Sequence, residues 1–364
     1  MKIIIAPNSF KGSLDAFEIC DILSSEISGP DIQVISLPMG DGGDGTASIL
    51  ANYLQASPIK IIARDALGRA HESIYYQHDK YAIIELASIC GLKTLQPEEY
   101  NVLNANTAGL GMAINHAVKS GMSEILLCIG GSASIDGGSG ALKEMGLTMI
   151  PYESQYNNYI IDLKDIDATY LQKKYKDIHI TILCDVNNPL CGTSGAASVF
   201  GPQKGASPAQ VTLLDRKLRE YGQLIARITG KEIIHLRHSG AAGGIAGSFH
   251  ALLNARLISG AEYCIHLSDF ESLLPQADFV ITGEGKLDEQ SMYGKIPGVL
   301  AEKCHRKHIP VLSVAGYTDI KKSMFTHHFS LMDYAPDMQE SIHNPVPYLR
   351  ALAHDIKKYL ISSL

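Results

Sequence analysis

Short apolar runs alternate with segments of helical periodicity at the start of the chain. Residues 2–6 form an apolar run that predicts a strand, residues 14–27 repeat with the period of an amphipathic helix, and residues 32–37 predict a second strand. This order is typical of a parallel β-α-β unit. Ser13 is the expected N-cap of the first helix, and a second helix is expected from Thr46 to about residue 54.

The middle of the chain has a different pattern. Polar and apolar residues alternate over 59–64, 73–77 and 82–86, with a turn at 78–80, which favours antiparallel strands. Further on, the sequence predicts helices at 107–120 and from Ser207 to about 229, and strands at 124–129 and 179–184. These segments indicate a mixed α/β region.

The β-α-β pattern returns near the end of the chain. Strands are expected at 279–282 and 311–315, and helices at 297–307 and from about 348 to 360. A chain of 364 residues exceeds what one hydrophobic core usually supports. We therefore predict an α/β fold of two domains, a discontinuous parallel-sheet domain of residues 1–66 and 275–364 and an inserted mixed α/β domain of residues 67–274.

Charge and composition narrow the functional class. The chain has 31 basic and 38 acidic residues, a net charge of -7, and no long run of either sign, which argues against a nucleic-acid-binding groove. No stretch approaches the ~20 apolar residues of a membrane span, and the first apolar run is short for a signal peptide. The seven cysteines are scattered without a CxxC pair, as in a cytoplasmic protein with reduced thiols.

Three glycine-flanked acidic clusters directly follow predicted strands. They span residues 40–45, 130–140 and 283–288. Ligands bind at the carboxyl ends of strands in open α/β sheets, and glycine lets backbone N–H groups approach a phosphate. No Walker A, GxGxxG or protein-kinase motif is present, so loop 130–140 is the best candidate for nucleotide phosphates. The alternative is a glycine-rich turn in which Asp136 caps a helix.

Carboxylates and lysines near these loops are candidates for the chemistry. Asp41 and Asp44 lie at i and i+3, so both could converge on a cation or a hydroxyl, although aspartate is also common in caps and Asx turns. Asp185 follows the strand at 179–184, where turn chemistry is the alternative. Lys11, Lys204 and Lys295 lie in or beside strand-end loops and could neutralise an anion or be surface charges.

Taken together, these segments resemble the glycerate kinase family of the bacterial type I kind over nearly the whole chain. The motifs that carry the resemblance are APNSFKGSLDA, PMGDGGDGT, IGGSASIDGGSGAL, CDVNNPLCGTSGAASVFGPQKGA, SGAAGGIAG and ITGEGKLDEQSMYGKIPGVLA. The resemblance implies ATP-dependent phosphorylation of D-glycerate by direct phosphoryl transfer. It also implies two α/β domains, one of them Rossmann-like and built from both chain ends, with the site in the cleft between them.

Phosphoryl transfer requires positioning, charge stabilisation, Mg²⁺ and a proton acceptor, and we assign candidates on that basis. The predicted catalytic residues are Asp41 or Asp288 as the base, with Lys11 and Lys295 to hold the glycerate carboxylate or the γ-phosphate. The predicted phosphate contacts are Gly130, Gly131, Ser132, Gly137, Gly138, Gly283, Glu284 and Gly285. Ser9, Asp44 and Lys204 are expected to contact the substrate, and Asp185 and Asp136 to bind Mg²⁺.

Two positions depart from the family pattern. Asn8 stands where an aspartate is expected and keeps a hydrogen-bonding side chain without the charge. Ile135 stands where an asparagine is expected and cannot make its polar contact.

The favoured product is 2-phosphoglycerate, although the choice between the 2- and 3-hydroxyl depends on positions within about an ångström. Two other functions remain open from the loops alone. One is a metal-dependent phosphohydrolase or phosphomutase, and the other is a binding protein for an organic acid. Neither nucleic acid nor membrane is an expected partner, and homo-oligomerisation is left open.

Overall fold

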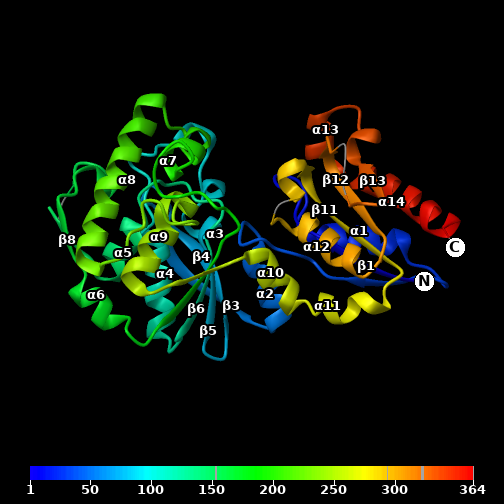
Figure 1. Cartoon of the computed structure of the whole chain (residues 1–364), viewed down its shortest axis with the longest axis horizontal. Helices are drawn as coiled ribbons and strands as arrows, with labels where there is room; N and C mark the ends of the chain where they lie inside the picture. Colours follow the sequence, from blue (N-terminus) through cyan, green and yellow to red (C-terminus); the bar gives the residue numbers. More distant parts are fainter. Residues whose placement is uncertain (152–153, 293, 321–323, 364) are drawn as a thin grey trace. The chain divides into compact units, whose positions relative to one another are not determined.

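The computed structural model describes residues 1–151, 154–292, 294–320 and 324–363, and the chain divides into two compact units (Figure 1). Unit 1 comprises Met1–Asp41 and Ser259–Leu364, and unit 2 comprises Gly42–Ile258. Each unit has its own β-sheet, so the predicted α/β fold with an inserted mixed domain is confirmed.

Unit 1 contains a parallel sheet with strand order β13-β12-β11-β1-β2. Its strands are β1 (Lys2–Pro7), β2 (Gln33–Ser36), β11 (Phe279–Leu287), β12 (Val311–Thr318) and β13 (His327–Ser330). β1, from the start of the chain, pairs with β11 from its last third, and Ala6 faces Thr282 across the pair. The two chain ends therefore build one sheet, as the two β-α-β patterns predicted.

Helices cover the sheet of unit 1 and complete its core (Figure 1). They are α1 (Ala16–Ile27), α10 (Gly260–Leu267), α11 (Phe270–Leu273), α12 (Ile296–Arg306), α13 (Met338–His343) and α14 (Pro345–Ser362). Leu23 of α1 and Ile356 of α14 belong to one buried cluster with Ile5 of β1. The expected N-cap Ser13 is wrong, because Asp15 accepts a hydrogen bond from the backbone N–H of Glu18 and forms a capping box with it.

Unit 2 contains a mixed sheet with strand order β10-β9-β6-β5-β4-β3, and a separate β7-β8 pair. The strands are β3 (Ser57–Arg64), β4 (Ala70–His78), β5 (Tyr81–Glu85), β6 (Glu124–Cys128), β7 (Thr148–Ile150), β8 (Asp165–Asp167), β9 (His179–Leu183) and β10 (Arg256–Ile258). β3, β4 and β5 pair antiparallel, as predicted, while β5, β6, β9 and β10 are parallel. Because β3 pairs only within this sheet among the described strands, unit 2 begins earlier in the chain than the boundary expected at residue 67.

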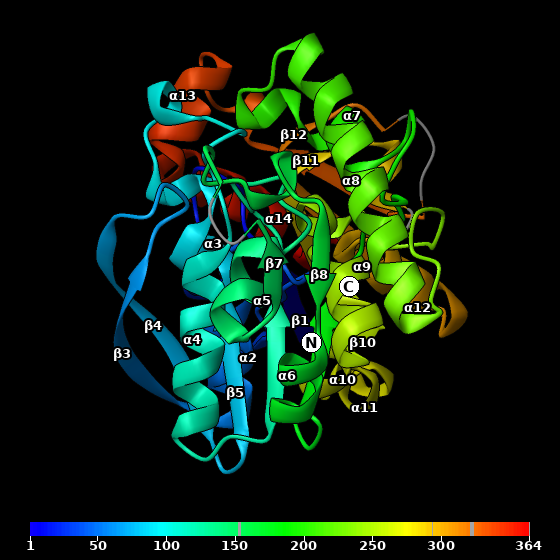
Figure 2. The ribbon, with the colours of Figure 1, turned by 90° about the vertical axis from the view of Figure 1, so that its left-hand side faces the viewer.

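The helices of unit 2 pack on this sheet and on one another (Figure 2). They are α2 (Thr46–Leu54), α3 (Leu86–Cys90), α4 (Ala108–Lys119), α5 (Ser139–Met145), α6 (Thr169–Lys174), α7 (Ala196–Phe200), α8 (Pro208–Thr229) and α9 (Ala241–Leu253). The helix predicted from Ser207 to about 229 is confirmed as α8, and Ser207 is its N-cap, whose hydroxyl accepts a hydrogen bond from the N–H of Gln210. In the described residues, no helix is long and apolar enough to cross a membrane.

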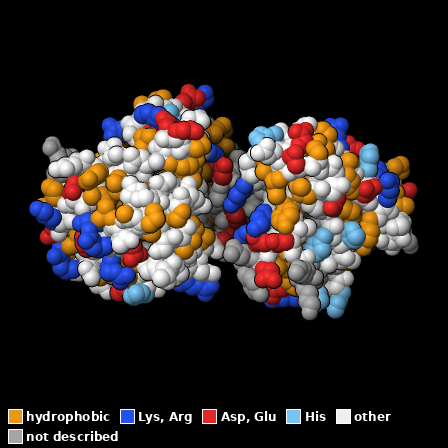
Figure 3. Space-filling view, turned by 90° about the horizontal axis from the view of Figure 1, so that it is seen from above, with side chains coloured by type: hydrophobic (Ala, Val, Ile, Leu, Met, Phe, Trp, Pro, Cys, Tyr) orange, Lys and Arg blue, Asp and Glu red, His pale blue; other side chains and the backbone are white. Residues whose placement is uncertain are grey.

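In each unit, the carboxyl ends of neighbouring parallel strands bring the loops that follow them close together. In unit 2, Glu85, Cys128 and Leu183 lie side by side at the ends of β5, β6 and β9. In unit 1, Pro7 at the end of β1 is level with Gly283 of β11. On the face shown in Figure 3, Lys and Arg side chains are interspersed with Asp and Glu side chains over both units. Loops that follow parallel strands carry most of the predicted site residues. Gly283, Glu284 and Gly285 are an exception, because β11 extends to Leu287 and these residues lie within the strand and not in a loop after it.

Candidate active site

Asn8 and Asp41 meet at the carboxyl edge of the unit 1 sheet. The Nδ2 of Asn8 donates to Oδ2 of Asp41 at 3.2 Å. Asn8 is buried, and its backbone N–H donates to Gly283 O at 2.9 Å, while its Oδ1 accepts from the N–H of Ser9 at 2.8 Å. Asn8, which departs from the family pattern, therefore orients Asp41, the predicted base. The backbone N–H of Ser9 in turn holds the side chain of Asn8.

A buried carboxylate lies beside two of the predicted lysines. Glu284, on β11, has an oxygen that accepts no hydrogen bond within the described residues and lies 3.5 Å from Nζ of Lys295. Burial raises the pKa of Glu284, and the negative charge of Asp41 raises it further, while Lys295 and Lys11 oppose the shift. Asp41, Lys11, Lys295 and Glu284 are thus electrostatically coupled within unit 1. Gly285 belongs to the same stretch, close to the backbone of Lys11.

Asp288 lies at the end of the same strand in a different environment. Its Oδ2 is 3.1 Å from Nζ of Lys286, and its Oδ1 accepts a hydrogen bond from the N–H of Ser291 at 3.2 Å. Partial burial acts to raise the pKa of Asp288, but Lys286 and Lys295 outweigh it, so the pKa is below its ordinary value. Asp288 is therefore ionised and comparatively weakly basic.

The glycine-rich loop of unit 2 follows β6 and has an exposed start and a buried end. Gly130 donates its N–H to Gly42 O at 3.0 Å, and Gly131 is exposed with a φ of 75°. Gly137 and Gly138 are buried, and a Cβ at Gly137 would lie 2.7 Å from the ring of Tyr221. Only the start of the loop is open to a phosphate, so the predicted phosphate contacts of Gly137 and Gly138 are not supported.

Asp136 organises this loop from the inside. Its Oδ2 accepts from the N–H and the hydroxyl of Thr107 and from the N–H of Gly140, at 2.9, 2.8 and 3.1 Å. Its Oδ1 accepts from Ser134 Oγ at 2.9 Å and from Gly138 N at 3.2 Å. Both oxygens are therefore engaged within unit 2, and Asp136 has the geometry of a structural carboxylate rather than the predicted metal ligand.

Lys204 is buried behind the same loop. Its Nζ donates to Ser132 Oγ and to Ser134 O, both at 2.7 Å. Burial lowers the pKa of Lys204 to about 7, with Asp136 acting in the opposite direction. The side chains of Lys204 and Ser132 hold the loop, so the predicted direct contact of Lys204 with the substrate is not supported.

A charged cluster at the end of β5 was missed in the sequence. Lys93 lies between Glu85, 3.2 Å from its Nζ, and Asp44, which it also contacts. The sequence signal for this cluster is Glu85, a glutamate at the end of the apolar strand predicted at 82–86. Carboxylates at the ends of strands indicate a ligand site in the other loops as well. Asp185, at the end of β9, is half-buried at the same edge of this sheet.

The described residues contain no group of three or more His, Cys, Asp or Glu side chains that could hold a metal ion by itself. A magnesium ion with one protein carboxylate and several ligand oxygens does not need such a group.

Comparison with known proteins decides the family. The model of the glycerate kinase family matches residues 3–361. The chain belongs to the glycerate kinase family. A glycerate kinase of Haemophilus influenzae is 37% identical over 327 residues, covering 87% of this chain and 86% of that protein. A glycerate 2-kinase of Escherichia coli is 36% identical over 325 residues, covering 87% of this chain and 85% of that protein.

A solved structure of the glycerate kinase family supports the same fold. A crystal structure from Salmonella typhimurium LT2, described as a glycerate kinase 2, has a TM-score of 0.82 and 31% identity, and the match covers 100% of this chain and 99% of that one. The family match includes both units, so the glycine clusters of unit 1 and unit 2 both lie within it. This chain is accordingly a kinase of the glycerate kinase family.

Proposed function

We propose that this enzyme transfers the γ-phosphoryl group of ATP to the 2-hydroxyl of D-glycerate, giving 2-phosphoglycerate and ADP. The observation that carries the proposal is the family match over residues 3–361, with a glycerate 2-kinase among the relatives. The alternative, a phosphohydrolase or phosphomutase, rested on the loops alone and is not favoured by this match.

The nucleotide phosphates are assigned to the exposed start of the unit 2 loop. Gly130 and Gly131 follow β6, and the positive φ of Gly131 suits a backbone that turns its N–H groups toward an anion. Gly285 is proposed as the corresponding backbone contact in unit 1, whereas the predicted contact of Gly283 is not supported, because Gly283 is buried within β11 and pairs with β1 and β12. Lys295, which precedes the first turn of α12, adds a positive charge for a phosphate.

The proton acceptor is assigned to Asp41. Asn8 fixes one of its carboxylate oxygens through the 3.2 Å hydrogen bond, while Lys286 and Lys295 lower the pKa of Asp288 and make it a weaker base than an ordinary aspartate. Asp41 takes the proton of the attacking hydroxyl, and Lys11 binds the glycerate carboxylate. Ser9 and Asp44 are proposed as further substrate contacts.

Magnesium fits Asp185 better than Asp136. The five hydrogen bonds to Asp136 leave its oxygens engaged, whereas Asp185 lies half-buried at a strand end. Magnesium typically binds through one or two carboxylates together with substrate phosphates, whose charge it neutralises. The role of Asp185 is to hold the ion beside the nucleotide phosphates.

We also infer that the protein works in a reducing compartment such as the cytoplasm. All seven cysteines are buried, and none of them forms a disulfide. None of them needs an oxidising environment for the fold.

Phosphorus NMR tests the proposed reaction. Purified protein is mixed with D-glycerate, ATP and Mg²⁺, and the ³¹P spectrum is followed with ADP measured in parallel. The 2-phosphoglycerate signal should grow in equal amount to ADP. A 3-phosphoglycerate signal would contradict the product assignment, and inorganic phosphate without phosphoglycerate would contradict the kinase proposal.

A further inference from the structure

The charged cluster of Asp44, Glu85 and Lys93 connects three loops of unit 2. Glu85 is the last residue of β5, and its Oε2 accepts a hydrogen bond from Ala47 N at 3.1 Å. Helix α2 begins at Thr46, and its N-cap, Gly45, has no side chain to cap it. Glu85 therefore supplies an acceptor that the start of α2 lacks, and it fixes the end of the loop that contains Asp44.

Lys93 approaches the cluster from the 3₁₀ turn η1 (Leu92–Thr94). The N–H of Leu92 donates to Gly131 O at 2.9 Å, and Gly91 pairs with Ser132, so this turn is joined to the glycine-rich loop. The Nζ of Lys93 lies 3.2 Å from Glu85 Oε1 and also contacts Asp44.

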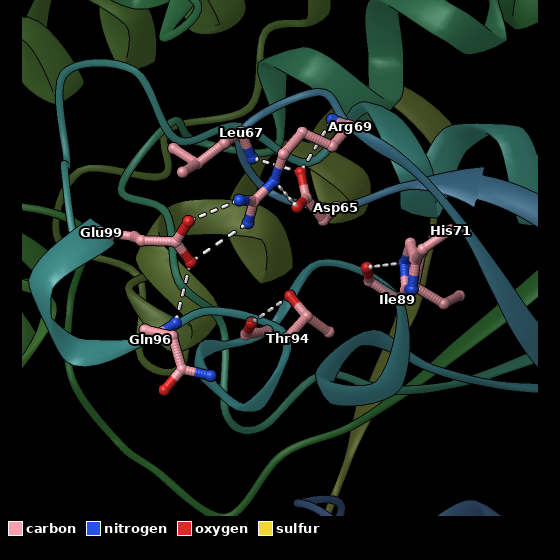
Figure 4. Close-up of polar contacts among 9 residues, drawn as sticks. Asp65, Leu67, Arg69, His71, Ile89, Thr94, Gln96 and Glu99 are labelled. Atoms are coloured by element: carbon pink, nitrogen blue, oxygen red, sulfur yellow. Dashed lines mark hydrogen bonds and ion pairs between the residues drawn. The ribbon is translucent and has the colours of Figure 1, made fainter.

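Hydrogen bonds and ion pairs join the segment that carries Lys93 to the β3–β4 hairpin, both before and after Lys93 in the chain (Figure 4). On one side, a ring nitrogen of His71 is 2.7 Å from Ile89 O. On the other side, Arg69 binds Asp65 through Nε at 2.6 Å and also binds both oxygens of Glu99. The backbone of Lys93 is consequently held in place independently of Asp44.

The three members of the cluster differ in exposure and in the direction of their pKa shifts. The side chain of Glu85 is 7% exposed, whereas those of Lys93 and Asp44 are 43% and 51% exposed. Burial raises the pKa of Glu85, and the positive charge of Lys93 opposes that shift. Burial acts to lower the pKa of Lys93, but the two carboxylates outweigh it and the pKa is raised. Lys93 is thus a charged group held by a buried partner, and Asp44 is the carboxylate of the cluster that is open to solvent.

The cluster suits a hydroxyl better than a phosphate. Two carboxylates and one ammonium carry a net negative charge, which repels the multiply charged phosphates of a nucleotide more strongly than the singly charged glycerate. A hydroxyl group, by contrast, donates a hydrogen bond to a carboxylate. Glycerate offers two such hydroxyl groups.

We propose that Glu85 and Lys93 are positioning residues of the glycerate site, which hold the Asp44 carboxylate where it accepts a hydrogen bond from a hydroxyl of glycerate. The inference rests on the proposed function, because it takes glycerate as the substrate. It assigns two residues, Glu85 and Lys93, that no motif pointed to.

Four variants of the full chain test this role: Lys93→Met, Lys93→Arg, Glu85→Gln and the double variant Glu85→Gln/Lys93→Met. Lys93→Met should raise KM for glycerate about tenfold, as expected for a charge-assisted contact that is lost, with KM for ATP changed by less than about twofold. Lys93→Arg should recover most of the affinity because the charge remains. Lys93→Met leaves the buried carboxylate of Glu85 without its cation, so it should also lower the melting temperature. The double variant should restore the melting temperature, since that carboxylate is gone, but it should not restore the KM for glycerate.

The matched control is an ion pair at the opposite end of β5, where this strand and its neighbour β6 begin. Lys80 precedes β5 and lies 3.3 Å from Glu124, the first residue of β6. Lys80→Met and Glu124→Gln should leave both KM values unchanged.

Two outcomes would overturn the inference. If the double variant recovers KM for glycerate together with stability, the cluster is only structural. If Lys93→Met raises KM for ATP instead, the cluster serves the nucleotide. Calorimetric titration of each variant with glycerate compares their affinities for glycerate without turnover. A wild-type protein that binds glycerate but does not phosphorylate it would therefore count against the proposed function and not against the role of Lys93.

Discussion

The ammonium group of Lys204 lies 2.7 Å from the hydroxyl of Ser132, inside unit 2 and directly behind the glycine-rich loop. Lys204, which the sequence predicts as a substrate contact, thus supports from inside the loop that we propose to bind nucleotide.

The buried lysine gives the stability of the protein a specific pH dependence. The pKa of Lys204 is lowered from 10.5 to about 7 by burial, so between these values the unfolded chain binds one more proton than the folded one. The free energy of unfolding should therefore gain a rising contribution with a slope of up to about 1.4 kcal/mol per pH unit above pH 7, and none below it. Lys204→Met removes this contribution.

Urea unfolding between pH 6 and 10 measures that slope. The exposed Lys60, paired with Glu72 on β4, offers the control Lys60→Met, which should keep the wild-type slope. Equal slopes for wild type and Lys204→Met would show that Lys204 titrates normally.

Replacement of Asp136 should be strongly destabilising. Asp136→Asn keeps the shape but turns an NH₂ group toward N–H and O–H donors of Thr107 and the loop, so we expect a loss of about 3 kcal/mol in the free energy of unfolding. Chemical unfolding measures it. The control Asp167→Asn removes an exposed carboxylate that also accepts two hydrogen bonds from Thr169, and should cost much less. Similar losses in the two variants would refute the special role of Asp136.

Asp41 and Asp288 should differ in their effect on turnover. Asp41→Asn should lower kcat by about 100-fold or more, because a general base contributes roughly 10²–10⁴. Asp288→Asn should have the smaller effect, since Lys286 and Lys295 keep this group weakly basic. Steady-state kinetics with saturating glycerate and ATP decide between them. The opposite ranking would transfer the role of base to Asp288, and near-wild-type kcat in both would exclude both.

Gly130→Ala should disturb the contact between two glycine loops of unit 2. A Cβ at this position would lie 2.5 Å from Cα of Gly43, so one loop must move. We expect a loss of about 1–3 kcal/mol in the free energy of unfolding and a fall in kcat/KM for ATP. Gly29→Ala is the control, since a Cβ there would meet only the end of the Lys357 side chain at 3.9 Å. Unchanged kinetics in Gly130→Ala would argue against phosphate binding at this loop.

The element types, the two β-α-β patterns and the motifs of the family can all be predicted from local sequence. The apolar run at 2–6 and the one at 279–282 became β1 and β11, neighbours in one sheet, because buried parallel strands need continuous apolar residues. The capping box of Asp15 and Glu18 is likewise a local signal, an aspartate followed three residues later by a glutamate.

Which polar side chains are buried, and which groups they pair with, could not be predicted from the sequence and depends on the fold. Asp136, Lys204 and Gly137 occur in motifs that look functional, yet their partners are inside unit 2. Glu85 and Lys93 had no motif, and their ion pair exists because the end of β5 faces a turn eight residues later. Local periodicity and turn chemistry act over a few residues, whereas burial and charge pairing depend on groups that the fold brings together from distant segments.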